Sequence, residues 1–133
     1  MFLWWPLWEF VCREAGDILD KTDRWNGCFN QGHYISKTKA SALAERLETL
    51  LRRRVVSAEA GWHLRRARRE RKKNCRVCHG RRVLVQRSDS GRVRTRCHHC
   101  DGTGRRRGVV KFRTAWIREF ASFCASSGGF RID

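Results

Sequence analysis

The feature that most constrains how this chain can fold is a pair of Cys-x-x-Cys motifs, Cys75–Cys78 and Cys97–Cys100. Two intervening residues let each motif turn and bring both sulfurs to one point, and two such motifs complete the tetrahedral set typical of a four-thiolate zinc site. Gly80 and Gly102 follow the second cysteine of each motif by two positions and can adopt the positive φ that such a turn needs. The spacing therefore predicts one Zn²⁺; a redox dithiol and ordinary buried thiols are the alternatives.

The segment between the two motifs is predicted to be a β-hairpin. Residues 82–86 and 92–96 have the composition of short strands, and Ser88–Gly91 between them is rich in turn formers. A hairpin would return the second motif to the first, which gives a ribbon-like module over residues 75–108. The segment has few apolar residues, so we expect the metal to supply much of its stability, on the order of 10 kcal/mol or more.

The predicted zinc is structural. Four thiolates close the coordination sphere and leave no open position at which a water could be activated. His79, His98 and His99 stand beside the cysteines and offer substitute ligands, but a complete cysteine set makes them solvent-facing or outer-sphere residues.

The second motif, Cys97-x-x-Cys100-x-Gly102-x-Gly104, matches a known repeat in full. It resembles the repeat of the cysteine-rich domain of DnaJ-type co-chaperones, and the first motif matches too, except that Arg82 replaces the last glycine. That family carries four repeats and two zinc ions, so the resemblance implies one ion here. No His-Pro-Asp tripeptide of a J domain is present. Over most of its length the chain also resembles small proteins of actinomycetes and their phages that pair such a module with an aromatic helix ending in Ser-Gly-Gly-Phe, here Ser127–Phe130.

The positive charge of the chain is concentrated in its middle. Thirty Lys and Arg against 13 Asp and Glu give a net charge of +17, yet residues 1–35 contain only three bases against five acids. A basic field of this density suits the phosphates of DNA or RNA. The residues predicted to bind nucleic acid are Arg65, Arg66, Arg68, Arg69, Arg71, Lys72, Lys73, Arg76, Arg81, Arg82, Arg92, Arg94, Arg96, Arg105, Arg106 and Arg107. The alternatives are a solvated charged face and an Arg excess from the codon bias of a GC-rich genome.

Hydrophobic periodicity predicts three to four helices outside the module. The clearest begins after the cap residue Ser36 and runs to about residue 53, with a Leu-rich stripe on one side. Others are expected over residues 6–15, from Ser57 as a cap to about residue 73, and from Thr114 as a cap onward. Residues 21–32 are predicted to be a turn-rich loop that packs on the domain through its aromatic residues, and residues 109–112 to be a short strand.

The expected fold class is therefore α+β, in four parts. A helical part (1–56) precedes an Arg-rich helical arm (57–74) and the zinc module (75–108), and a C-terminal strand with an aromatic helix (109–133) packs back on the first part. We refer below to residues 57–74 as the arm and to residues 75–108 as the module.

The sequence favours a non-enzymatic binding protein. It contains no phosphate-binding Gly-rich loop, no paired-carboxylate pattern and no cofactor fingerprint, so no small-molecule substrate is evident. Segment 65–107 contains no aromatic residue on which a base could stack, so sequence-specific readout is not indicated. The apolar start of the chain stops at Glu9, which is too short for a membrane span, and seven cysteines, an odd number, favour a reducing cytoplasmic setting.

Two functional hypotheses follow. In the first, the protein binds DNA or RNA through the arm and the module, in a phage or bacterial regulatory setting. In the second, the module serves as a protein-interaction adaptor, as its resemblance to the cysteine-rich domain of DnaJ-type co-chaperones implies, and exposed tryptophans such as Trp25 or Trp62 dock the partner.

Overall fold

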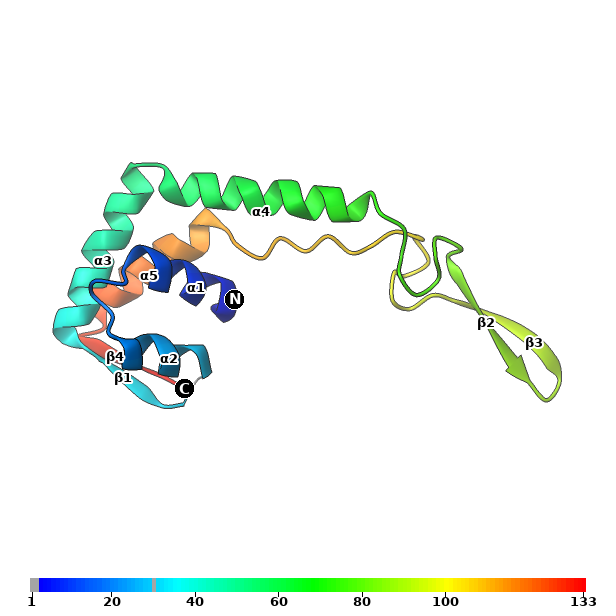
Figure 1. The fold of residues 1–133 in the computed structure, drawn as a ribbon, viewed down its shortest axis with the longest axis horizontal. Helices are drawn as coiled ribbons and strands as arrows, with labels where there is room; N and C mark the ends of the chain where they lie inside the picture. The colour runs from blue at the N-terminus through cyan, green and yellow to red at the C-terminus, as the bar shows by residue number, and fades with distance from the viewer. Residues whose placement is uncertain (1–2, 30) are drawn as a thin grey trace. The chain divides into compact units, whose positions relative to one another are not determined.

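The computed structural model describes residues 3–29 and 31–133. Within these residues the fold is α+β, with five helices and two antiparallel two-stranded sheets (Figure 1). The chain divides into two compact units. Unit 1 comprises Met1–Gly61 and Lys111–Asp133, and unit 2 comprises Trp62–Val110. None of the helices in the described residues is long and apolar enough to cross a membrane.

The core of unit 1 is built on helix α3 (Lys37–Arg52), whose Leu-rich stripe is buried as predicted. This stripe packs against helix α5 (Thr114–Ser126), which contributes Ile117 and Phe120 to the same core. Helix α1 (Trp4–Glu14) adds a second apolar layer, in which Trp4 stacks on Trp8 and meets Phe120 edge-on. Unit 1 therefore has a hydrophobic core of its own.

Helix α2 (Lys21–Phe29) lies where the sequence predicted a loop, and that prediction was wrong. Asp20 and Asp23 form a reciprocal capping box, since each carboxylate accepts a hydrogen bond from the other residue's backbone N–H. Gly27, a turn former in the sequence, lies inside the helix. Only glycine fits there, because a Cβ would lie 2.2 Å from the Trp8 ring. Contact with α1 thus overrides the local preference of this segment for a turn.

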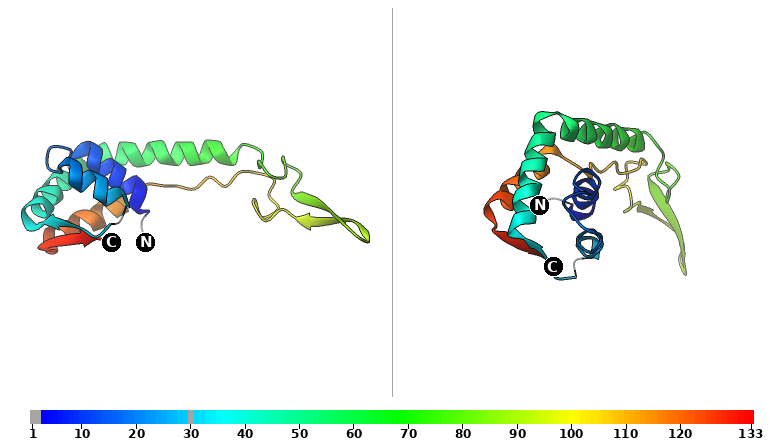
Figure 2. Two further views of the ribbon diagram at one scale, coloured as in Figure 1. Left: turned by 60° about the horizontal axis from the view of Figure 1, so that its bottom comes forward. Right: turned by 60° about the vertical axis from the view of Figure 1, so that its left-hand side comes forward.

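Unit 1 is closed by a sheet of β1 (His33–Ser36) and β4 (Gly129–Ile132). The strands pair antiparallel, with Ile35 opposite Phe130. Figure 2 shows this ribbon beneath α3 and α5, and α1 beside α2. Ser36 ends β1 and caps α3 as predicted, because its hydroxyl accepts a hydrogen bond from the Lys39 N–H.

Three further local predictions were wrong. Helix α4 (Val55–Arg71) begins two residues before Ser57, which therefore lies in its first turn and is not the cap. The residue at the N-cap of α5 is Arg113, and Thr114 is the first helical residue. Residues 109–112 form no strand; within the described chain, Phe112 is instead buried in unit 1 and packs on Phe10 at 5.0 Å between ring centroids.

Unit 2 contains the C-terminal half of α4, the four-cysteine cluster and a hairpin of β2 (Val83–Ser88) and β3 (Gly91–Arg96). The predicted hairpin is confirmed, and each of its strands is one residue longer than expected. Ala67 is the buried residue of the arm, because the returning chain passes it at Gly108, where a Cβ would lie 2.0 Å from the Ala67 carbonyl oxygen. Arg71 Nε donates to the Gly108 carbonyl and fixes the same contact.

Candidate metal centre and its basic surroundings

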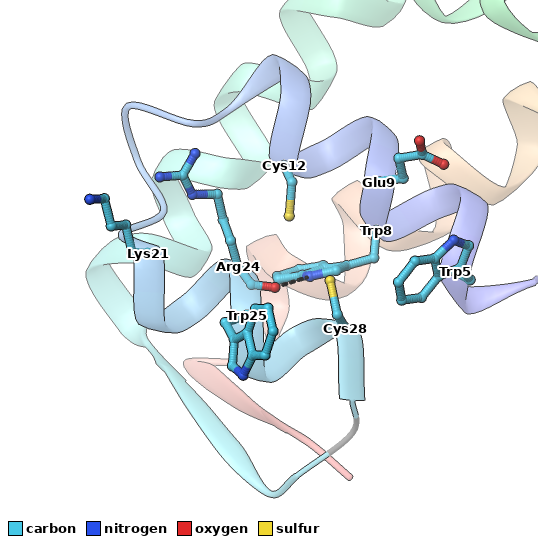
Figure 3. Close-up of a pocket in the computed structure, with 8 residues that line it drawn as sticks. All are labelled: Trp5, Trp8, Glu9, Cys12, Lys21, Arg24, Trp25 and Cys28. Carbon is cyan, nitrogen blue, oxygen red and sulfur yellow. Dashed lines mark hydrogen bonds between the residues drawn. The ribbon is translucent and has the colours of Figure 1, made fainter.

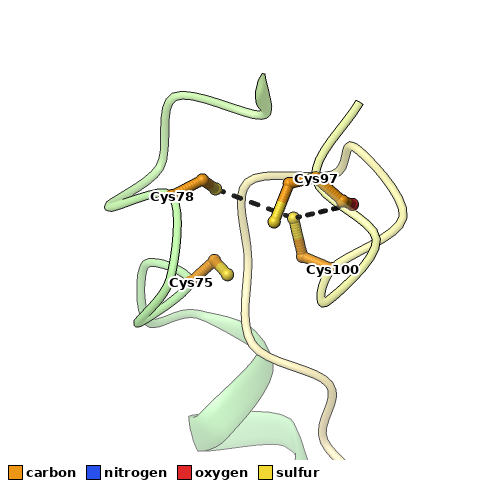
Figure 4. A group of neighbouring side chains, drawn as sticks. All are labelled: Cys75, Cys78, Cys97 and Cys100. Atoms are coloured by element: carbon orange, nitrogen blue, oxygen red, sulfur yellow. Dashed lines mark hydrogen bonds between the residues drawn. The ribbon is translucent and has the colours of Figure 1, made fainter. Parts of the chain in front are cut away.

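The four cysteines of the two motifs converge in the structure as a possible site for a single metal ion. Their Sγ atoms all lie within 4.8 Å of one another, and all four residues are buried. Figure 4 shows the two sulfurs of each motif pointing into one space from opposite loops. The 3.7 Å between the Sγ atoms of Cys78 and Cys100 matches the edge of about 3.8 Å of a tetrahedron with metal–sulfur bonds of about 2.3 Å.

The two motifs have the same backbone conformation. The residue after each second cysteine, His79 or Asp101, has φ of 51° or 52°, and the glycine that follows has φ of 84° or 73°. The correspondence extends to the position where the sequence repeat breaks: Arg82 has φ of 69° and its counterpart Gly104 has φ of 75°. Arg82 therefore adopts a left-handed backbone conformation that glycine takes freely and that costs another residue about 1–2 kcal/mol.

Backbone hydrogen bonds join the motifs around the sulfurs. Cys75 N–H donates to the Gly104 carbonyl, and Cys97 N–H to the Arg82 carbonyl, so each motif is tied to the other at both ends. Gly104 N–H donates to Cys100 Sγ at 3.3 Å. Burial raises the pKa of Cys100, but this N–H and the neighbouring thiols outweigh it and lower the pKa to about 6. For Cys97, burial prevails and raises the pKa.

Replacement of Gly104 by alanine is expected to weaken metal binding about 10- to 100-fold, as loss of an outer-sphere contact typically does. A Cβ at this position would lie 2.8 Å from the Gly80 carbonyl oxygen, in a backbone conformation that disfavours a side chain. Arg82→Gly is the matched control, since glycine suits the same conformation at the equivalent site, and its metal affinity should be unchanged or higher. Competition with a chromophoric chelator measures both; equal loss in the two variants would contradict the prediction.

The three histidines beside the cysteines are solvent-facing, as predicted. His79, His98 and His99 are all exposed, and none belongs to the described cluster of possible ligands.

Seven of the basic residues predicted to bind nucleic acid make hydrogen bonds or ion pairs inside unit 2. Arg106 and Lys73 both pair with Glu70 and lower its pKa to about 2. Arg105 donates to the Lys72 carbonyl and to Asn74 Oδ1. Arg71 donates to the Gly108 carbonyl, and Arg81 donates to the Cys78 carbonyl. Arg96 donates to the Asp101 carbonyl, and Arg107 forms an ion pair with the Asp101 carboxylate. These contacts fasten the arm to the two cysteine loops.

A second group of basic side chains makes no hydrogen bond or ion pair within residues 3–29 and 31–133. They come from the arm, from the first cysteine loop and from the hairpin, and all are exposed. This group contains Arg65, Arg66, Arg68, Arg69, Lys72, Arg76, Arg82, Arg87, Arg92 and Arg94. Of these, Arg66 lies over the Trp62 ring at 5.3 Å.

Sequence reasoning missed Arg87, a member of this basic group, and did not place Trp62 beside the basic residues. Arg87 lies on β2, one residue beyond the predicted end of the strand, and only the observed register places it opposite Arg92. Trp62 is 48% exposed and lines one groove on α4 together with Arg65, Arg69 and Lys73. Helical spacing of 62, 65, 66, 69 and 73 is the signal that would have found this groove.

A separate aromatic surface lies on unit 1. The aromatic residues expected to pack loop 21–32 on the domain are exposed instead, Trp25 by 64% and Phe29 by 50%, and Tyr34 of the neighbouring strand β1 is 59% exposed. Trp25 lines a cavity of about 500 Å³ between α1 and α2, with Trp5 on its other side (Figure 3). Burial raises the pKa of the Cys12 thiol in this cavity to about 12, so the thiol stays protonated.

No protein family, curated protein or solved structure matches the chain.

Proposed function

We propose that the cysteine cluster holds one structural Zn²⁺ and that unit 2 binds nucleic acid without catalysing a reaction. The observation that most supports nucleic-acid binding is the positive charge of unit 2. Residues 62–110 contain 17 Lys and Arg against three acidic residues, a formal net charge of +14, whereas the rest of the chain has 13 against 10. Ten of these basic side chains are exposed and without a hydrogen bond or ion pair among the described residues.

The donor set supports zinc. Thiolate is the soft ligand that zinc accepts in structural sites, and four converging sulfurs leave no position for water or substrate. Four thiolates with one Zn²⁺ would lower the formal charge of unit 2 by two, so it would remain strongly basic. The ion's role is then to position the basic loops and not to react.

The distribution of the free charges supports a phosphate backbone as the ligand. They are spread over the arm, a cysteine loop and the hairpin, as expected for contacts along an extended polyanion. We further propose that the protein works in a bacterial or phage regulatory setting in the cytoplasm; the resemblance of its module and of the Ser127–Phe130 ending to small actinomycete and phage proteins supports this origin, not the activity.

A salt-dependent anisotropy titration tests this function. The full chain, with its zinc content measured, is titrated with a labelled duplex and a single strand. We expect one zinc per chain and an affinity whose logarithm falls with the logarithm of salt concentration by about 0.9 per duplex phosphate contacted. An arm variant with Arg65, Arg68 and Arg69 changed to Gln should bind more weakly and with a shallower slope.

The matched control removes the same charge from unit 1. Lys37, Arg53 and Arg118 are exposed and lie outside unit 2, so changing all three to Gln should leave affinity and slope nearly unchanged. Equal losses of affinity in the arm and control variants would show that binding depends on the net charge of the chain and not on the arm. Absence of binding by the zinc-loaded wild type to either nucleic acid would remove the proposal.

The aromatic surface of unit 1 favours a second candidate function, a protein-interaction adaptor. Trp5 and Trp25 stand half or more exposed at the sides of one cavity, and exposed tryptophans are typical centres of protein interfaces. If the zinc-loaded chain binds no nucleic acid, the adaptor function is the better-supported of the two.

A further inference from the structure

The β2–β3 hairpin has two chemically different faces. Residues directly opposite in an antiparallel pair share a face, and alternate residues along a strand do too. The observed register pairs Arg87 with Arg92 and Val85 with Arg94 on one face. The members of this arginine face are Val83, Val85, Arg87, Arg92, Arg94 and Arg96; the other face holds Leu84, Gln86, Ser88, Gly91, Val93 and Thr95 and carries no charge.

All four arginines of the two strands are thus on one face. Codon bias raises the number of arginines in a chain, but it does not choose their side of a sheet. The one acidic residue of the hairpin, Asp89, lies in the turn outside the two strands. The segregation therefore sets one face of the hairpin apart as a cationic surface.

This cationic surface lacks an anionic partner in the part of the chain that the structure describes. Arg87, Arg92 and Arg94 make no hydrogen bond or ion pair among the described residues, and Arg87 directly faces Arg92. Like charges directly opposite destabilise a strand pair, and an isolated two-stranded hairpin is marginally stable in water. Exposed Val85 and Val93 show that neither face is packed beyond the base of the hairpin, where Leu84 meets the cysteine cluster. A polyanion would relieve this repulsion.

We propose that the arginine face lies in the major groove of double-stranded DNA. This inference rests on the proposed nucleic-acid function and names its substrate class. The major groove is about 12 Å wide and admits a two-stranded β-ribbon, whose strands are about 4.8 Å apart. Alternate residues of a strand are spaced by about 6.8 Å, close to the rise of two base pairs. Arg87, Arg92 and Arg94 then reach guanine edges or the phosphates beside the groove.

The same features argue against the other nucleic acids. Single strands are held by aromatic side chains on which bases stack, and neither hairpin strand contains an aromatic residue. The major groove of an RNA duplex is too narrow for side chains to enter. Duplex DNA is the form whose groove matches both the width and the charge of this ribbon.

The test compares three variants of the full chain on one labelled DNA duplex. The hairpin variant changes Arg87, Arg92 and Arg94 to Gln, and the arm and unit 1 variants described above carry matched charge changes elsewhere. We expect the hairpin variant to lose about 10²- to 10³-fold in affinity at 0.1 M salt, with a slope shallower by about 2.7, because three phosphates are no longer neutralised. Zinc content and circular dichroism confirm that each variant is folded.

Protection of guanine N7 from methylation locates the hairpin, because N7 lies in the major groove. Wild type and arm variant should protect N7, and the hairpin variant should not. Tighter binding of wild type to single strands or to RNA duplexes, or binding without N7 protection, would overturn the inference. An unchanged affinity of the hairpin variant beside a weakened arm variant would overturn it too and leave the proposed function standing. Absence of all binding by wild type would remove both.

Discussion

Removal of the metal is expected to unfold the cysteine loops and the hairpin while unit 1 stays folded. The buried cluster of this part of the chain consists of the four cysteines, with Leu84 packed against it. Without an ion, nothing of comparable size holds the loops together, and structural zinc contributes on the order of 10 kcal/mol or more in such modules. Unit 1 has a separate core from α1, α3 and α5 and does not depend on the ion.

Hydrogen exchange read by mass spectrometry distinguishes the two units. Excess chelator, or Cys97→Ser, should abolish protection in residues 75–104 and leave that of α3 and α5 intact. Cys28→Ser is the matched control, because Cys28 is a free cysteine outside the cluster, and it should retain one zinc per chain. Unchanged protection of the hairpin after complete metal release would show that the ion is not structural.

The four-cysteine cluster could be predicted because the pattern that specifies it is local in the sequence. Two cysteines three positions apart and a glycine two positions later determine the shape of each loop, and the structure repeats that shape at both motifs. Even Arg82, which breaks the sequence repeat, takes the conformation of Gly104, because the hydrogen bond from Cys97 N–H to its carbonyl holds that position. The spacing of the cysteines thus determines the backbone conformation of the loops more strongly than the residue at position 82 does.

Helix α2 and the roles of the arginines depend on contacts distant in sequence. Gly27 reads as a turn former, yet Trp8 packs against its bare Cα, and Trp4 Nε1 donates to its carbonyl. Likewise nothing in the run of basic residues separates Arg106, which pairs with Glu70 36 positions away, from an unpaired neighbour on the arm. Periodicity describes a residue's own element, whereas these assignments require knowing which element lies beside it.

Asp23→Ala is expected to destabilise unit 1 by about 1–3 kcal/mol, the typical cost of losing a buried hydrogen-bonded group and a helix cap. Asp23 is 2% exposed, and its carboxylate accepts from His33 Nε2 at 2.8 Å, from Lys39 Nζ and from the Asp20 N–H. It therefore joins α2 to β1 and α3. Alanine would end the capping box of α2 and leave the Lys39 ammonium with Asp20 alone.

Asp17→Ala provides the matched control for this prediction. Asp17 also pairs with a cation, Arg46 of α3, but its side chain is 63% exposed, against 3% for Asp23. Exposed ion pairs contribute little to stability, so urea unfolding followed by circular dichroism should show almost no change for this variant. Asp23→Asn, which keeps the acceptor oxygen and loses the charge, should fall between the two. Equal unfolding midpoints for Asp23→Ala and Asp17→Ala would show that burial of the Asp23 network does not stabilise unit 1.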